Sequence, residues 1–350
     1  MNAASLLEES KLPRLRSVVL LPCLALLAGC NMVLLQPAGD VARGNRDVLI
    51  ASTALMLLII IPVMVATVVI AWRYRHTNTA VPYEPKWNHS TGIEVAIWSA
   101  PLAIIIALGA LTWVSTHLLD PYRPLAQSVA GRPAASASRP LRVQVVALDW
   151  KWLFFYPDLG IATVNELAAP VDTPIDFKIT SSHQMNSFFI PAIAGQIYAM
   201  PGMETPLHAV INKTGVFDGF SANYAGAGFS DMKFKVHSLS KADFQRWLDR
   251  VRSKGGVLDR AAYLRLEAPS ERDPVRYFAT VPGDLYNAAL NQCVDRTKMC
   301  VAEMMRRDAQ AGRSVTKAAP MAGMAMPGMD MSAMPAGRSA DQHPPKNPKE

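Results

Sequence analysis

Soft sulfur ligands are concentrated near the two ends of this sequence of 350 residues. The four cysteines are Cys23, Cys30, Cys293 and Cys300, so that no cysteine lies between positions 31 and 292. Copper sites that transfer electrons depend on cysteine thiolates. The long central part of the chain therefore lacks the residue needed for either a mononuclear blue-copper site or a dinuclear copper site.

The C-terminal tail holds a second group of sulfur atoms. Thioethers are soft ligands that suit Cu(I), and six methionines fall within 14 residues: Met321, Met324, Met326, Met329, Met331 and Met334. The same tail is rich in Pro and Ala, a composition typical of disordered segments. Two interpretations stay open, a weak Cu(I) site and a disordered tail without a ligand.

The central region instead offers a loop of small residues, "GFSANYAGAGFSDM", at positions 219–232. Loops held between strands often carry ligands, but this one has no His, no Cys and only one carboxylate. His183, His208 and His237 lie in or near other strand-like segments and are not at ligand spacing. We therefore predict no metal site in this part of the chain.

Residues 1–29 have the pattern of a bacterial lipoprotein signal peptide. Basic residues precede the apolar run 18–27, and the sequence Leu-Ala-Gly-Cys ends at Cys30. In such signals the cysteine is lipidated and becomes the new N-terminus. We predict that Cys30 is the lipidation site; the alternative is an ordinary signal peptide with a chance cysteine.

Two uncharged segments are long enough to cross a membrane. Residues 48–71 would form a helix of about 36 Å at about 1.5 Å per residue, and residues 95–116 a helix of similar length. A lipidated Cys30 places the start of the first span outside the cytoplasm, and the loop 72–94 carries the basic residues expected of a cytoplasmic loop. The chain from about residue 117 is then periplasmic.

Composition agrees with a membrane protein and argues against nucleic-acid binding. Half of the residues are hydrophobic and only 18% are charged. The net charge of +7 comes from scattered residues, with no block of five or more basic residues. We therefore predict no nucleic-acid partner.

The periplasmic part divides into strands followed by helices. Short strand-like runs separated by Pro and Gly fill residues 141–239 and predict a β-sandwich or Greek-key barrel. From Ser240 the pattern turns helical, with Phe244, Trp247, Leu248 and Val251 on one helical face. The fold class is thus a membrane-anchored all-β protein with two transmembrane helices and a C-terminal helical extension.

Six residues separate Cys293 from Cys300 in this exported region, where disulfides form. A disulfide between them would staple a segment with a thin core. Two free thiols are the alternative, and copper coordination together with the nearby Met299, Met304 and Met305 is a third possibility.

Three long motifs in the exported part carry a family resemblance. After the Leu-Ala-Gly-Cys signal and the two spans, three segments follow in this order: "ALDWKWLFFYPDLGIATVNELAAP", "SSHQMNSFFIPAIAGQIYAMPGM" and "GFSANYAGAGFSDMKF". In this arrangement the chain resembles subunit II of the bo-type ubiquinol oxidases, members of the haem–copper oxidase superfamily. The resemblance covers about residues 27–310 and implies a cupredoxin-like fold for residues 141–239.

Relatives that accept electrons from cytochrome c bind a dinuclear copper centre in this domain. Their ligands are an upstream His and a loop with two Cys, a Glu between them, a His and a Met. The resemblance places these ligand positions, all without their ligand here, at Asn186, Phe220, Ala222, Tyr224, Gly228 and Asp231. It also implies that the loop keeps its length and that Phe220 and Tyr224 fill the former copper pocket.

The resemblance further implies a proton-pumping complex that oxidises ubiquinol and reduces oxygen to water. Haems and the binuclear haem–copper centre would lie on subunit I, and this chain would bind no cofactor. Subunits I, III and IV, membrane lipid and the substrate ubiquinol are the implied partners. Asp149 and Lys151 are candidate contacts with the catalytic subunit.

Cytochrome c is not expected as a donor, because it would need an acidic docking face, and residues 141–240 hold 8 acidic and 6 basic side chains. The alternatives are a stand-alone periplasmic copper-handling lipoprotein and a cytochrome c oxidase subunit II. The predicted location is the bacterial inner membrane, with a lipid anchor, two membrane passes and a periplasmic domain.

The predicted organisation consists of nine segments. They are the signal peptide 1–29, the lipidated segment 30–47, the first transmembrane helix 48–71, the cytoplasmic loop 72–94, the second transmembrane helix 95–116, the linker 117–140, the cupredoxin-like domain 141–239, the helical extension 240–312 and the Met- and Pro-rich tail 313–350.

Overall fold

The computed structural model describes residues 32–82, 84–123 and 139–317. Cys30, the six tail methionines and most of the predicted linker lie outside these residues. The chain divides into two compact units, residues 1–301 and residues 302–350. A short 3₁₀ helix, η1 (Val33–Leu35), begins the described part of the first unit.

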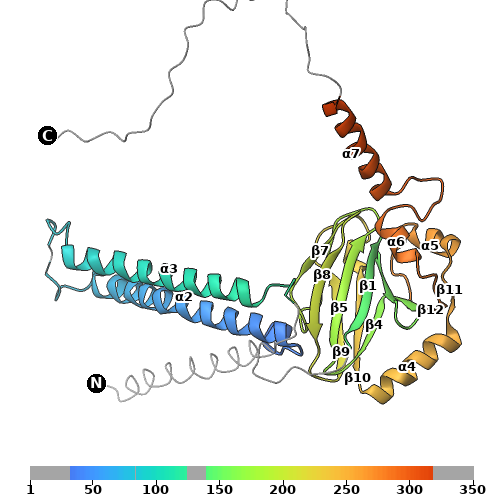
Figure 1. The fold of residues 1–350 in the computed structure, drawn as a ribbon. Coiled ribbons are helices and arrows are strands. Elements are labelled where there is room, and N and C mark those ends of the chain that lie inside the picture. Colours follow the sequence, from blue (N-terminus) through green and yellow to red (C-terminus); the bar gives the residue numbers. More distant parts are fainter. Residues whose placement is uncertain (1–31, 83, 124–138, 318–350) are drawn as a thin grey trace, which may run out of the picture. The chain divides into compact units, whose positions relative to one another are not determined.

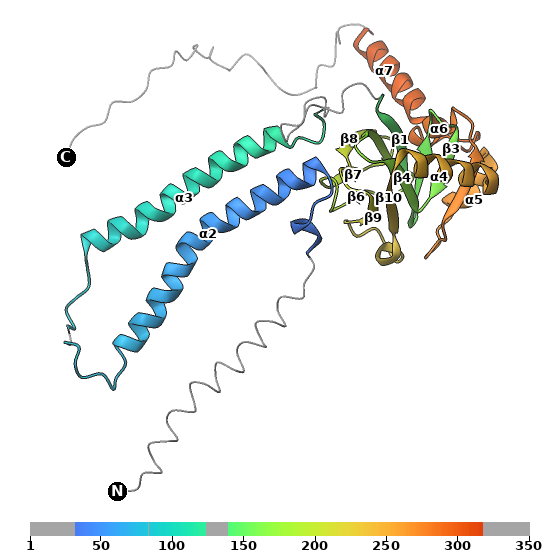
Figure 2. The same ribbon diagram turned by 90° about the horizontal axis from the view of Figure 1, so that it is seen from below.

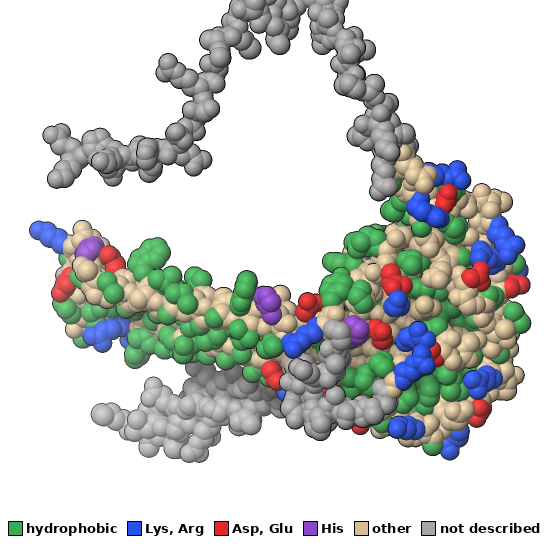
Figure 3. Space-filling model, viewed as in Figure 1, with side chains coloured by type: hydrophobic (Ala, Val, Ile, Leu, Met, Phe, Trp, Pro, Cys, Tyr) green, Lys and Arg blue, Asp and Glu red, His purple; other side chains and the backbone are tan. Residues whose placement is uncertain are grey.

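Two long helices follow, α2 (Asp40–Arg73) and α3 (Thr91–Leu118). They run antiparallel beside each other (Figures 1 and 2). Both contain the proline of the predicted span, Pro62 or Pro101. Apolar side chains cover much of the exposed surface of the helices (Figure 3). By length and composition both are candidate membrane spans, as predicted.

Helix α2 is longer than the predicted first span. Its 34 residues correspond to about 51 Å at about 1.5 Å per residue, whereas a hydrocarbon core is about 30 Å thick. The extra turns are residues 40–47, a polar stretch that a hydropathy argument leaves out. Part of this stretch is buried: Val41 and Ala42 are 8% and 4% exposed.

The β-domain is a sandwich of two sheets. The first has the strand order β11-β12-β3-β2-β1-β5-β8, in which β1 pairs with β2 antiparallel and with β5 parallel. Its strands are β1 (Leu141–Leu148), β2 (Lys151–Tyr156), β3 (Ile161–Val164), β5 (Pro174–Ser181), β8 (Thr205–Val210), β11 (Gly256–Val257) and β12 (Arg276–Thr280).

The second sheet has the order β4-β10-β9-β6-β7 and carries the glycine-rich loop at one end of β9. Its strands are β4 (Glu166–Pro170), β6 (Asn186–Phe189), β7 (Ile197–Ala199), β9 (Gly215–Ser221) and β10 (Lys233–Leu239). A 3₁₀ turn, η2 (Phe229–Asp231), closes the loop before β10. The two sheets confirm the predicted β-sandwich.

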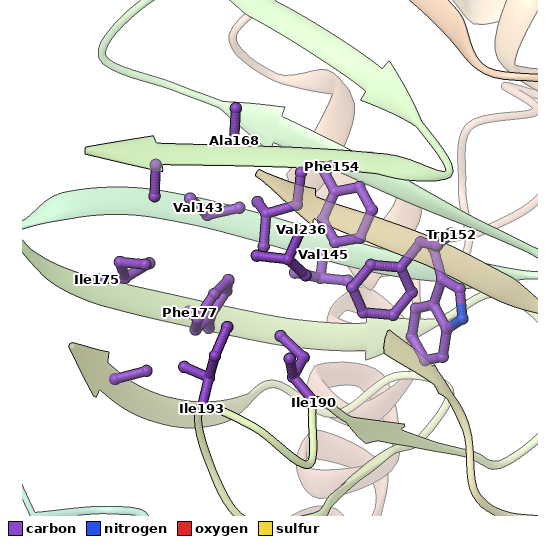
Figure 4. Close-up of a cluster of buried hydrophobic side chains, with 14 of the residues drawn as sticks. Val143, Val145, Trp152, Phe154, Ala168, Ile175, Phe177, Ile190, Ile193 and Val236 are labelled. Atoms are coloured by element: carbon purple, nitrogen blue, oxygen red, sulfur yellow. The ribbon is translucent and has the colours of Figure 1, made fainter. Parts of the chain in front are cut away.

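An aromatic core lies between the sheets (Figure 4). Trp152 and Phe154, from β2, are fully buried and contact Phe188 and Phe234 of the second sheet. Alternation along the strands sends these side chains inward. Aromatic side chains bury large apolar areas, so this cluster is the main support of the end of the sandwich that carries the loop.

One strand-like run of the sequence is part of two strands in the structure. The run "HAVINKTGVF" at positions 208–217 divides into the end of β8 and the start of β9. The turn lies at Asn212–Thr214, and Gly215 follows with a φ of +154°. Asn and Gly favour turns for conformational reasons, and here they transfer the chain from one sheet to the other.

The C-terminal extension contains the predicted helices, α4 (Lys241–Lys254), α5 (Arg260–Glu267) and α6 (Leu285–Leu290). Ser240 caps α4 by accepting a hydrogen bond from the amide of Asp243, and the four predicted apolar side chains of α4 are all buried. The extension is not wholly helical, however. Strand β12 pairs with β3 and joins the first sheet, so the extension is part of the sandwich.

Glu166 joins the extension to the second sheet. Its carboxylate accepts hydrogen bonds from Trp247 Nε1 at 2.7 Å and from the Tyr277 hydroxyl at 2.9 Å, and His237 Nε2 lies 3.6 Å away. Burial, with a further contribution from Glu166, raises the pKa of Tyr277 to about 12. The hydroxyl therefore stays protonated and donates throughout the physiological range.

The last helix, α7 (Val301–Lys317), lies almost wholly in the second unit. Within it, Glu303 forms ion pairs with Arg306 at 2.6 Å and Arg307 at 3.0 Å. Such pairs, three and four residues apart, support a solvated helix.

Candidate functional site

The glycine-rich loop, positions 219–232, runs from the end of β9 through η2 and contains five of the six predicted ligand positions; the sixth, Asn186, lies beside it. Asn186, at the start of β6, is buried, and its side-chain oxygen lies 3.3 Å from Ser221 Oγ. The Asn186 amide nitrogen donates to the Gln184 carbonyl at 3.1 Å. Both polar ends of this side chain therefore contact the protein itself, in the position of the upstream histidine.

The remaining positions offer almost no metal ligand. Phe220 packs its ring edge-on against Phe189, and Ala222 and Gly228 have no donor atom in the side chain. Asp231 has a carboxylate, but Arg272 Nε donates to it at 2.9 Å and this hydrogen bond raises the pKa of Arg272. A dinuclear copper centre does not fit this set of side chains, because it requires bridging thiolates.

Tyr224 does not fill a pocket, contrary to the prediction. It is 77% exposed, and its ring contacts that of Phe229. Phe220 is also partly exposed and lies on the outer face of the sheet. Both side chains are therefore at least partly exposed, whereas the resemblance implied that they fill the former copper pocket.

Trp150 covers the loop in their place. Its indole Nε1 donates to the carbonyl of Ala225. A Cβ atom built on Gly226 would lie 2.9 Å from Trp150 Cζ2, and one built on Gly228 would lie 2.6 Å from Trp150 Cδ2. The two glycines let the indole lie directly on the loop backbone. The sequence signal was the Gly-Ala-Gly spacing, but nothing local identified Trp150 as its partner.

Hydrogen bonds to β6 and to the residue before it also hold the loop. The amide of Ala222 donates to the carbonyl of Ser187 at 2.9 Å, and Asn223 Nδ2 donates to the carbonyl of Met185 at 3.2 Å. The loop is thus held by Trp150 and by hydrogen bonds to the segment that begins β6.

The histidines of the sandwich each lie beside one carboxylate. His183 Nδ1 is 3.3 Å from Asp149, and His208 Nδ1 is 3.3 Å from Asp176. His237 is the neighbour of Glu166 described above. In the part of the chain that the structure describes, no group of three His, Cys, Asp or Glu side chains is arranged to hold a metal ion.

Lys151 and Asp149 are buried, contrary to their prediction as contacts with another subunit. Lys151 is 1% exposed and donates to the carbonyl of Ala268 at 2.8 Å and to Ser270 Oγ at 2.6 Å. Asp149 is 9% exposed beside His183. The lysine holds the C-terminal extension to the sandwich, so it is not available to a partner.

Cys293 and Cys300 are bonded to each other, with their Cα atoms 4.8 Å apart. A cavity of about 290 Å³ lies beside this bonded loop and is lined by residues that include His183, Glu267 and Lys298. Burial raises the pKa of Glu267. The lining mixes positive and negative side chains, which favours no single class of ligand.

The class of protein follows from two family matches. Residues 158–239 match the family described as cytochrome c oxidase subunit II, periplasmic domain, and residues 252–296 match the COX aromatic rich motif. The second match includes β12, which the structure places in the sandwich. The fold and these matches define a membrane-anchored oxidase subunit II.

Relatives that align over most of their length identify the family within this class. The chain is 47% identical over 286 residues to cytochrome bo(3) ubiquinol oxidase subunit 2 of Pseudomonas putida, with 82% of this chain and 88% of that protein covered. It is 50% identical over 262 residues to ubiquinol oxidase subunit 2 of Acetobacter aceti, with 75% and 83% covered. The chain belongs to the ubiquinol oxidase subunit 2 family.

A solved structure also aligns with part of the chain. It is the crystal structure of the periplasmic domain of subunit II of cytochrome oxidase (CoxB) of Bradyrhizobium japonicum, at 22% identity and a TM-score of 0.32. The alignment covers 34% of this chain and 97% of that domain.

Proposed function

We propose that this chain serves in a respiratory ubiquinol oxidase as a structural subunit through which no electron passes. The observation that carries the proposal is the set of side chains at the six ligand positions, which includes no thiolate, imidazole or thioether. The names of its relatives, which are ubiquinol oxidase subunits, support the choice of donor.

In the proposed complex, two ubiquinol molecules are oxidised for each oxygen molecule reduced to two waters, with proton pumping. Haems and the binuclear haem–copper centre would lie on subunit I, and subunits III and IV would complete the complex. This chain would contribute the apolar surfaces of α2 and α3, which bind neighbouring membrane helices or lipid, and a sandwich that covers the periplasmic face of subunit I.

We further propose that the chain lies in a bacterial inner membrane with its sandwich in the periplasm. Lipidation of Cys30 would add a lipid anchor before α2, in addition to the two spanning helices. Mass spectrometry of the mature N-terminus tests this point. An unmodified N-terminal residue other than Cys30 would contradict it.

The decisive experiment is to purify the chain with its bound partners in mild detergent and to measure oxygen uptake. We expect uptake with ubiquinol and none with reduced cytochrome c. Uptake with cytochrome c would reveal an electron-entry site and overturn the proposal. A chain that purifies alone, without haem, would favour a copper-handling lipoprotein, the function suggested by the Met-rich tail.

A matched variant separates packing from electron transfer. Trp150→Phe keeps an aromatic ring over the loop but removes the indole and its hydrogen bond. If the loop is only structural, ubiquinol-driven uptake per haem should stay within about twofold of the unsubstituted complex. A loss of more than about tenfold in an intact complex would indicate a functional route through Trp150.

A further inference from the structure

The residues just before α2 are built into the β-sandwich. Ala38 is 1% exposed and belongs to the same hydrophobic core as Trp152 and Phe188, although β1 begins only at Leu141. The intervening sequence holds both membrane helices. The sandwich is therefore completed by a segment from the other side of the helical hairpin.

Backbone hydrogen bonds hold this segment on two sides. The carbonyl of Ala192 accepts from the amides of Ala38 at 2.7 Å and Gly39 at 3.0 Å, and the amide of Asn212 donates to the carbonyl of Ala38 at 2.7 Å. Gly39 and Ile211 form an antiparallel bridge. The segment thus lies between the loop after β6 and the end of β8.

The first turn of α2 continues these contacts. Asp40 Oδ1 accepts from Asn212 Nδ2 at 2.6 Å, and the amide of Ala42 donates to the carbonyl of Ile193 at 3.3 Å. Arg43 also pairs with Asp40, at 3.2 Å. An acidic residue in the first turn suits the helix dipole, so the same carboxylate stabilises the helix start and binds the sandwich.

Gly39 is the position where no side chain fits. A Cβ atom there would lie 2.4 Å from the carbonyl oxygen of Ile193 and 2.8 Å from that of Val210. Both obstacles are backbone atoms, which cannot rotate away as a flexible side chain can. A residue larger than glycine must therefore push the segment off the sandwich.

The hairpin is closed at the same end. A Cβ atom on Gly44 would lie 2.6 Å from Leu119 Cδ2, so α2 and the residue after α3 are in close contact there. The start of α2 and the end of α3 therefore lie side by side near the sandwich.

We propose that residues Ala38–Arg43 form a latch that fixes the sandwich non-covalently to the membrane hairpin. The position of the domain is then set by these contacts as well as by the covalent connection. The proposal rests on these contacts and does not depend on the electron donor, on lipidation or on the proposed function.

Cutting the covalent connection tests the latch directly. A protease site is inserted between Ser128 and Pro140 of the full chain, which carries a C-terminal affinity tag and is purified in mild detergent without partner subunits. After complete cleavage, the fragment with α2 and α3 should co-elute with the tagged sandwich. Separation of the two fragments, with the sandwich still folded, would overturn the proposal.

Gly39→Ala is the variant that should release the cleaved fragments. Gly92→Ala is the matched control, since it makes the same change in the first turn of α3, where a new Cβ meets nothing within 4 Å. For Gly39→Ala we expect the fraction of the α2–α3 fragment that co-elutes with the tagged sandwich to decrease at least fivefold. For the control we expect no decrease. Equal retention of both variants would contradict the latch.

Hydrogen exchange of the unsubstituted chain provides a measurement that does not depend on a variant folding. The amides of Ala38, Gly39 and Asn212 should exchange at least a hundredfold more slowly than unprotected amides in the same local sequence, because the latch must open first. Exchange of Ala38 and Gly39 at the rate of an unprotected amide would show that the contacts do not persist, and the proposal would fail.

Discussion

Lys151 and Asp273 form an ion pair inside the protein, with Nζ and Oδ2 3.3 Å apart. Both side chains are almost fully buried, at 1% and 4% exposure. Lys151 begins β2, whereas Asp273 lies just before β12, so the pair joins the sandwich to its C-terminal extension. Burial lowers the pKa of Lys151, an effect that Asp273 partly offsets.

Removing the lysine should destabilise this junction strongly. Lys151→Met leaves Asp273 as a buried charge with fewer partners, and breaking a buried pair costs about 3–5 kcal/mol. Urea unfolding of the purified chain, followed by tryptophan fluorescence, measures the change. Lys213→Met, at an exposed lysine, is the control and should shift stability by less than about 0.5 kcal/mol. Equal effects at the two positions would show that the pair contributes nothing.

Acid should weaken the junction through Asp273. Burial disfavours its charged form, but Ser270, Arg276 and Lys151 together hold the pKa of this carboxyl below its usual value. A lowered folded-state pKa stabilises the fold above the unfolded value of about 3.9, and this stabilisation is lost as pH falls through the folded-state pKa. The melting temperature should thus decrease once the pH drops below about 4.

The variant Asp273→Asn isolates this contribution. It should be less stable at pH 7, because Lys151 then loses its charged partner. It should also lose less stability than the unsubstituted chain when pH is lowered from 5 to 2. Parallel pH profiles for the two proteins would rule out Asp273 as a source of acid sensitivity.

The contact between Trp150 and the loop predicts a coupling between two positions. Gly228→Ala forces the indole away from the backbone and should cost about 1–3 kcal/mol, as overpacking does. Gly256→Ala, where a new Cβ meets nothing within 4 Å, is the control. The double variant Trp150→Ala/Gly228→Ala should lose less unfolding free energy than the sum of the losses of the two single variants. Strict additivity in urea unfolding would contradict the contact.

The bond between Cys293 and Cys300 should stabilise the end of the extension. Its loop is short, so the entropic effect is roughly 2–3 kcal/mol. Cys293→Ser/Cys300→Ser should lose this amount in urea unfolding, and a reductant should have the same effect on the unsubstituted chain. A reductant that still destabilises the double variant would point to another cause.

Local patterns in the sequence predicted the elements of this protein well. The spacing of Phe244, Trp247 and Val251 predicted the buried face of α4, since helical periodicity is a property of a short segment. Uncharged length predicted both candidate spans for the same reason. The absence of cysteine from positions 31–292 was likewise read directly from the sequence. It shows that the loop has no thiolate with which to bind copper.

Contacts between distant segments were decided only by the tertiary structure. Trp150 lies on Gly226 and Gly228, a contact that no local pattern predicted. Lys151 is buried against the segment around Asp273, although it was predicted as a contact with another subunit. Ala38 enters a core that begins at Val143. Composition, charge and periodicity describe a residue and its neighbours in sequence. Which surfaces meet depends on how two sheets, a hairpin and an extension pack together, and that is fixed by long-range burial.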